Sequence, residues 1–175
     1  LNFQIEDLET TSSASDILKK QEGSYTDLYF NYEITQDLRD RKFRTQDGYQ
    51  TTFAQELPII SDNNEISNAF EVSKFKKLST KSEMIGKISF YGKAITSLDD
   101  DVRISKRLQI PSYRLRGFEK GKVGPVENND YIGGNYLSTI NISTTLPNIL
   151  EDFDNLDIGI FLDAANLWGV DYNSS

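Results

Sequence analysis

The sequence predicts an all-β fold, an antiparallel meander of long strands that is interrupted by one short helix and one long loop. The clearest sign is a polarity that alternates every second residue between Asp27 and Leu38, where the even positions are apolar except for Gln36. Similar segments follow through connections too short for a crossover helix, so neighbouring strands are expected to be antiparallel. The segments are roughly 10 to 14 residues long, which suits strands that tilt across a bilayer better than strands of a soluble sheet.

Six or seven strands are expected in chain order, and the first of the seven is the tail of a further strand. We place them at 1–8, 27–38, 49–60, 65–78, 83–97, 134–146 and 156–168. Turn-forming clusters at 61–64 and 77–81 separate three of these strands. Between the first two strands, the segment from Ser13 to Gly23 is typical of a short helix, with Ser or Asp near its N-cap and Gly at its C′ position.

The segment from Asp99 to Asn129 shows little periodicity and is expected to be a long loop. Loops of this length inside a compact architecture are usually functional or disordered. The last strand, in contrast, has two distinct faces. One face carries Leu156, Ile158, Ile160 and Leu162, and the other carries Asp157, Gly159, Phe161 and Asp163. If the apolar face meets lipid, Asp163 points to the opposite side of the sheet.

Composition excludes several classes of function. The 175 residues include no cysteine and no histidine, which excludes zinc ligation by these side chains and a Cys or His nucleophile. A net charge of -8 argues against a nucleic-acid partner, because phosphate binding needs an excess of Lys and Arg. The mean hydropathy of -0.51 argues against membrane helices but not against a β-barrel, in which only every second residue meets lipid. No signal peptide is recognisable, and we expect an internal piece of a longer protein.

Clusters of like charge are expected to be solvated loops and turns. The basic cluster contains Lys74, Lys76, Lys77 and Lys81, and the acidic clusters are 99–101 and Glu151, Asp152 and Asp154. Neither acidic cluster has the alternating ligands and the glycine turn of an EF-hand, and nothing favours a carboxylate pair of the glycosidase kind. We therefore expect no metal, no cofactor and no enzymatic activity.

Several short motifs follow one another in the C-terminal half of the chain. They are Leu115-Arg116-Gly117-Phe118, Gly124-Pro125, Asp130-Tyr131-Ile132-Gly133-Gly134-Asn135, and Phe161-Leu162-Asp163 before Leu167-Trp168. A lone Arg-Gly-Phe would carry little information, but the order and the spacing together are specific. They resemble the signature of the BamA-type outer-membrane protein assembly factors.

In that family, an arginine on a long loop folds back into the barrel and meets an aspartate on a later strand. The resemblance implies that Arg116 pairs with Asp163, and a guanidinium can bind a carboxylate in a bidentate way. The implied loop motif comprises Leu115, Arg116, Gly117, Phe118, Gly124 and Pro125, and the implied strand-start motif comprises Asp130, Gly133 and Gly134. A second acid of the family falls on Ser143, which cannot pair a charge. Glu33 or another acid in the lumen is therefore expected to substitute.

Further structural features are expected from the resemblance and from the residue types. Asp40-Arg41 and Thr45-Gln46-Asp47-Gly48 resemble the periplasmic turn of the family, in which the Asp-Gly step reverses the chain. The helix near Ser13 is expected in an extracellular loop. Five glycines are expected to supply positive φ angles or close backbone approach, namely Gly117, Gly121, Gly124, Gly133 and Gly134. Aromatic girdles at the membrane interfaces are expected to include Tyr25, Tyr29, Tyr91, Tyr136 and Trp168.

The resemblance implies that residues 1–175 are part of a sixteen-stranded transmembrane β-barrel in the bacterial outer membrane, without its POTRA modules and closing strands. The implied function is noncovalent insertion and folding of outer-membrane proteins, with lipid, unfolded β-barrel clients and accessory lipoproteins as partners. A two-partner secretion transporter and a translocation-and-assembly-module barrel remain alternatives. A soluble β-sandwich, in which Leu28, Phe30, Tyr32 and Ile34 would face a protein core, is a third.

Overall fold

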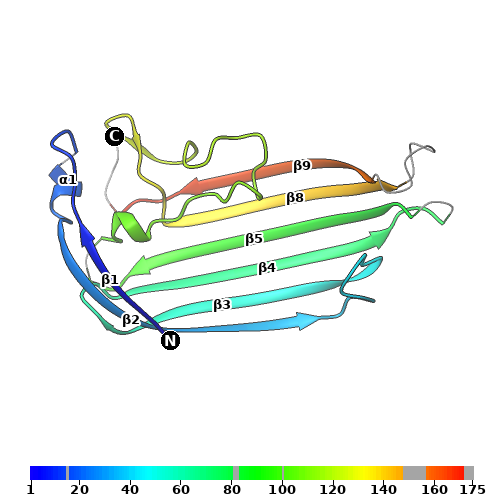
Figure 1. The fold of residues 1–175 in the computed structure, drawn as a ribbon, viewed down its shortest axis with the longest axis horizontal. Helices are drawn as coiled ribbons and strands as arrows, with labels where there is room; N and C mark the ends of the chain where they lie inside the picture. The colour runs from blue at the N-terminus through cyan, green and yellow to red at the C-terminus, as the bar shows by residue number, and fades with distance from the viewer. Residues whose placement is uncertain (15, 81–82, 100, 148–156, 172–175) are drawn as a thin grey trace.

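The computed structural model describes residues 1–14, 16–80, 83–99, 101–147 and 157–171, and seven of its strands form one antiparallel sheet (Figure 1). In order across the sheet these strands are β1 (Asn2–Leu8), β2 (Gly23–Asp37), β3 (Asp47–Ser61), β4 (Glu65–Lys77), β5 (Ile85–Ser97), β8 (Tyr136–Pro147) and β9 (Asp157–Trp168). The antiparallel meander that the sequence predicts is confirmed, and most strand ends lie within a few residues of the expected positions. In the described sheet, β1 and β9 are the edge strands.

The connections contain three small elements. A short helix, α1 (Asp16–Lys19), lies between β1 and β2, and a 3-10 helix, η1 (Ile104–Lys106), and the ribbon of β6 (Val126–Glu127) and β7 (Asp130–Tyr131) lie between β5 and β8. The predicted helix is shorter than expected because the N–H groups of Gln21 and Glu22 bond to carbonyls three residues back, which tightens the chain into a turn. Gly23 is not its C′ residue but the first residue of β2.

The two faces of the sheet differ in what covers them. The outward face carries apolar side chains that remain exposed, among them Phe30, Ile34, Phe70, Ile88, Ile140 and Leu162. No second sheet in the described part of the chain covers this face, although a β-sandwich would need one. The inward face carries polar side chains such as Asp27 and Thr139, which lie beneath the connection between β5 and β8. This asymmetry is typical of a barrel wall with lipid outside and a polar interior.

The aromatic residues divide between these faces, and the girdle prediction is wrong for three of the five. Tyr25, Tyr29 and Tyr91 share the inward face, because they occupy the positions that alternate with the exposed apolar residues. Tyr136 and Trp168 point outward, and their rings stack with centroids 5.8 Å apart. Alternation fixes which residues share a face, but the type of residue does not decide whether an aromatic ring meets lipid or the interior.

The connection between β5 and β8, residues 98–135, folds over the inward face, and we call it the inner loop (Figure 1). A hydrophobic core joins it to β5, β8 and β9, and its buried members are Ile95, Val102, Leu108, Ile110, Leu115, Leu137 and Leu167. Burial of each such side chain contributes about 1.5–3 kcal/mol. Two backbone hydrogen bonds between Leu108 and Gly134 also close the base of the loop. The inner loop is therefore packed against the sheet.

Glycine permits the closest approaches in this region. Gly117, Gly121, Gly124 and Gly133 have positive φ angles. A Cβ on Gly124 would lie 2.6 Å from Leu167 Cδ2, and one on Gly134 would lie 2.7 Å from the carbonyl oxygen of Trp168. Side chains at these two positions would push the inner loop away from β9.

The turn between β2 and β3 is held by Asp40, whose Oδ1 accepts the backbone N–H groups of Gln46 and Asp47 at 2.9 and 3.2 Å. The chain reverses between β2 and β3, before the Asp-Gly step, because Asp47 and Gly48 already pair with β4. The prediction that Asp47-Gly48 makes the reversal is therefore wrong. Gly48 has a φ of 103°, and a Cβ there would overlap the carbonyl oxygen of Leu38.

No helix among the described residues is both long enough and apolar enough to cross a membrane.

We predict that Gly48→Ala destabilises the fold by at least about 1–3 kcal/mol, since alanine tolerates neither the positive φ nor the overlap with Leu38. The check is urea unfolding of the full-length protein, followed by the gel mobility of the folded form. Gly159→Ala is the matched control, because the nearest atom to a Cβ there is 3.9 Å away. An equal loss of stability in both variants would contradict the prediction.

Candidate functional site

Three arginines of the inner loop reach carboxylates on the strands beneath it. Arg103, Arg114 and Arg116 each form an ion pair with an acid of the inward face. The partners lie on β2, β4 and β9, so the contacts extend across most of the sheet. A guanidinium presents several donors in a fixed plane, which suits it to hold a loop in one orientation.

Arg116 and Asp163 form a bidentate pair. Arg116 Nε lies 2.7 Å from Asp163 Oδ2 and Nη2 lies 2.6 Å from Oδ1, while the Arg116 backbone N–H donates to Oδ2 at 3.0 Å. The guanidinium also lies over the ring of Phe161, 3.6 Å from its centroid. Hydrogen bonding to Asp163 raises the pKa of Arg116 above its ordinary value. Only 3% of the Asp163 side chain is exposed, against 37% of the Arg116 side chain, so water reaches the pair mainly at the arginine.

Asn141, on β8, links this pair to the next one. Its side-chain Nδ2 donates to Asp163 Oδ1 at 2.8 Å and to the backbone oxygen of Arg114 at 2.7 Å. One amide group therefore uses both of its protons to hold the carboxylate on β9 and the chain of the inner loop.

Arg114 pairs with Glu71 on β4. Its Nη2 lies 2.7 Å from Glu71 Oε2 and its Nη1 lies 3.3 Å from Oε1. The guanidinium lies 3.7 Å from the centroid of the Tyr91 ring and its side chain is only 9% exposed. Arg114 stands two residues before Arg116 in the sequence, which brings it near the predicted site. No sequence pattern identifies Glu71 as its partner.

Arg103 is the most enclosed of the three arginines, with 2% of its side chain exposed. Its Nη2 lies 2.6 Å from Asp27 Oδ2 on β2 and 3.2 Å from Glu65 Oε2 on β4, and its backbone N–H donates to Glu65 Oε1 at 2.8 Å. Tyr29 donates its hydroxyl to Glu65 and accepts from Arg103. Burial disfavours the charged guanidinium, but the hydrogen bonds to Asp27 and Glu65 outweigh this effect and raise the pKa of Arg103. Sequence analysis did not identify this cluster.

The remaining motif residues have structural positions. Leu115 is buried in the core beneath the inner loop, whereas Phe118 is 61% exposed. Pro125 accepts the backbone N–H of Ile132 through its carbonyl oxygen. Asp130 lies exposed in β7, and Gly133 passes close to Arg107 and Leu108.

Ser143 lies on the inward face of β8, where it pairs in register with Lys87 and Phe161. No arginine is hydrogen-bonded to Ser143 in the described residues. Glu33 is exposed on β2 and is not the partner of Arg116. The additional acid that anchors the inner loop near Arg116 is Glu71, which binds the neighbouring Arg114 instead.

The residues of this site hold the inner loop in position against the sheet. Among the described residues, no three acidic side chains are grouped as ligands of a metal ion. Asp99 accepts hydrogen bonds from Asn64, while Asp100 and the cluster at 151–154 lie outside the described residues. The arrangement holds a loop against a wall through charge-assisted hydrogen bonds, which are stronger than neutral ones.

Comparison with known proteins gives a family and a fold. The family model of the Omp85 superfamily domain matches residues 1–175. Among solved structures, BamA from Haemophilus ducreyi lacking POTRA domains 1–3 matches with a TM-score of 0.73 at 18% identity. The match covers 83% of this chain and 31% of that one, so the chain spans about a third of its length. No curated protein matches the sequence.

We predict that Arg103→Met destabilises the protein by roughly 3–5 kcal/mol, because it leaves the carboxylates of Asp27 and Glu65 buried without their cation. The measurement is the urea midpoint of the full-length protein. Lys120→Met, in an exposed part of the same loop, is the control and should change stability by less than about 0.5 kcal/mol. A midpoint for Arg103→Met equal to that of the control would refute the buried anchor.

A double-mutant cycle of Arg114→Leu and Glu71→Leu is expected to give a coupling energy of about 1–3 kcal/mol, because the pair is bidentate and largely shielded. The cycle of Lys76→Leu and Asp47→Leu is the matched control. Those side chains also pair at 2.8 Å, but they are 64% and 57% exposed, so their coupling should stay below about 1 kcal/mol. Equal couplings in the two cycles would show that shielding adds nothing at Arg114.

Proposed function

The chain belongs to the Omp85 superfamily, and on that premise we propose that its protein inserts and folds β-barrel proteins in the bacterial outer membrane. Family membership and the fold support an outer-membrane β-barrel of the assembly or secretion type. The assembly function is the more specific statement that we propose. The observation that carries it is the bidentate contact between Arg116 of the inner loop and Asp163 of β9.

The mechanism that we propose is noncovalent. A client strand pairs with an exposed strand edge by β-augmentation, and the barrel thins the bilayer locally so that the client enters it. This mechanism needs a region of the barrel wall that opens to expose a strand edge and a second region that stays rigid. The described sheet supplies the second part, since arginines of the inner loop bind β2, β4 and β9 from the inside.

The apolar outward face supports membrane contact, and the polar inward face supports a hydrated interior. Arg116 and Asp163 lie where the inner loop crosses β8 and β9, and Asn141 fixes the same carboxylate. The loop therefore braces the interior at the strands farthest from β1. Unfolded β-barrel clients, outer-membrane lipid and accessory lipoproteins are the partners that this function would require.

We predict that Arg116→Ala in the full-length protein slows the folding of a β-barrel client into liposomes several-fold, because it removes charge-assisted hydrogen bonds worth roughly 1.5–3 kcal/mol each. Arg116→Lys keeps the charge but loses the bidentate geometry, so an intermediate rate is expected. The rate is followed by the gel mobility of the folded client. Lys120→Ala, on the same loop, is expected to leave the rate unchanged.

Protease protection of the inner loop is measured on the same samples. A normal client-folding rate together with a cleaved loop in Arg116→Ala would contradict the brace. If wild-type protein folds no client but carries one partner protein across the vesicle membrane, the assembly function is wrong and a secretion transporter is indicated.

A further inference from the structure

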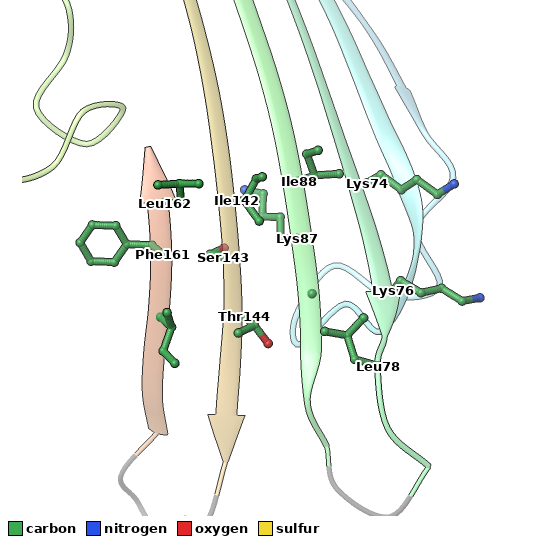
Figure 2. A pocket seen from close by; sticks show the side chains of 12 residues that line it. Lys74, Lys76, Leu78, Lys87, Ile88, Ile142, Ser143, Thr144, Phe161 and Leu162 are labelled. Atoms are coloured by element: carbon green, nitrogen blue, oxygen red, sulfur yellow. The ribbon is translucent and has the colours of Figure 1, made fainter. Parts of the chain in front are cut away.

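The outward face of the sheet contains a hollow of about 460 Å³ near the turn between β4 and β5 (Figure 2). Apolar side chains from four connected segments line it, and they are Leu78, Ile88, Ile142, Ile160 and Leu162. Gly86 contributes no side chain, and a Cβ there would lie 3.0 Å from Leu78 Cδ1. The missing side chain on β5 leaves the hollow open between its neighbours.

Two lysines border the hollow at the level of its apolar residues. In strand register, Lys74 pairs with Ile88, and Lys76 pairs with Gly86. Ile88 in turn pairs with Ile142, which pairs with Leu162. Figure 2 shows both lysine side chains extending from β4 on the side away from β8 and β9. The cations therefore lie beside the apolar surface and not beyond its end.

The two ammonium groups differ in their partners. Lys76 Nζ lies 2.8 Å from Asp47 Oδ2, whereas Lys74 forms no ion pair with a described residue and its side chain is exposed. A lysine next to apolar surface can lay its aliphatic stem along that surface and hold its charge at the membrane interface. Lys74 thus lies at the edge of an apolar hollow with no acidic partner among the described residues.

We propose that this hollow binds an anionic phospholipid, with an acyl chain against its apolar lining and the headgroup phosphate at Lys74. An anionic amphiphile matches both properties of the site, the apolar lining and the uncompensated positive charge. A neutral phospholipid would leave Lys74 without a counter-charge. Inorganic phosphate would make no use of the hollow, and a peptide strand would bring backbone polar groups against Ile142 and Leu162 without partners.

The proposal goes beyond client folding. It needs only an outward face that meets a bilayer, so it can fail or succeed independently of the assembly function. A basic residue near a membrane surface contributes about 1 kcal/mol toward anionic lipid, which corresponds to about fivefold in association.

The test uses the full-length protein in phosphatidylcholine vesicles, with a fluorophore on Ala164→Cys. Ala164 lies on the outward face of β9 one step from Leu162, and this chain has no other cysteine. Cysteines elsewhere in the protein are replaced by serine. Quenching is titrated with brominated phosphatidylglycerol or with brominated phosphatidylcholine, and the ratio of the two half-quenching fractions is the readout.

Brominated phosphatidylglycerol is expected to quench at about fivefold lower fraction than brominated phosphatidylcholine. Lys74→Gln should bring the ratio close to one. Lys77→Gln, which removes the same charge three residues farther along β4 and on the inward face, should leave the ratio unchanged. Gly86→Leu keeps every charge but fills the hollow, so it should also reduce the ratio.

Three results would overturn the proposal. They are a ratio of one in the wild-type protein, a preference that survives Lys74→Gln combined with Lys76→Gln, or an equal loss in Lys77→Gln. If added inorganic phosphate abolishes the preference for phosphatidylglycerol over phosphatidylcholine, Lys74 binds free phosphate, and the lipid proposal is also overturned. Absence of quenching by either lipid would show that this face does not meet the bilayer, whereas normal quenching with failed client folding would contradict only the assembly function.

Discussion

The carboxylate of Asp163 accepts hydrogen bonds from the side chain and the backbone of Arg116 and from Asn141, and the position of the inner loop depends on it. A buried carboxylate is costly unless it is fully bonded, so the loop and the strand stabilise each other. The same logic is repeated at Arg114 and Arg103, which bind acids on β4 and β2. These contacts hold the inner loop across the sheet while the hydrophobic core beneath it excludes water.

The inward and outward faces of the sheet therefore make different kinds of contact. On the inward face, Arg103, Arg114 and Arg116 of the inner loop meet carboxylates at short distance. The outward face is mostly apolar, and Lys74 and Lys76 lie on it beside Ile88 and Gly86, near the turn between β4 and β5. A wall of this kind can contact lipid outside and keep a fixed interior. Both properties suit the wall of an outer-membrane barrel.

Much of the site could be predicted from the sequence because the resemblance names positions along the chain. Arg116 and Asp163 are 47 residues apart, and only their place in a known motif order joins them. Arg103, Asp27 and Glu65 carry no such motif, so charge patterning alone could not bring them together. Glu71 was equally hidden, since the inward face of β4 carries two acids, Glu65 and Glu71, and only the fold decides that Arg114 reaches Glu71.

The sequence by itself determined the strands, their antiparallel order and the composition of each face, because a period of two is a local property of an extended chain. It also determined where the long loop falls. Only the tertiary structure decided that Arg103 and Arg114 of this loop reach acids on β2 and β4, and that Tyr29 and Tyr91 lie on the inward face while Tyr136 and Trp168 point outward. The reason is physical: pairing between arginines and carboxylates far apart in the chain depends on strand register and on curvature, which no local pattern specifies.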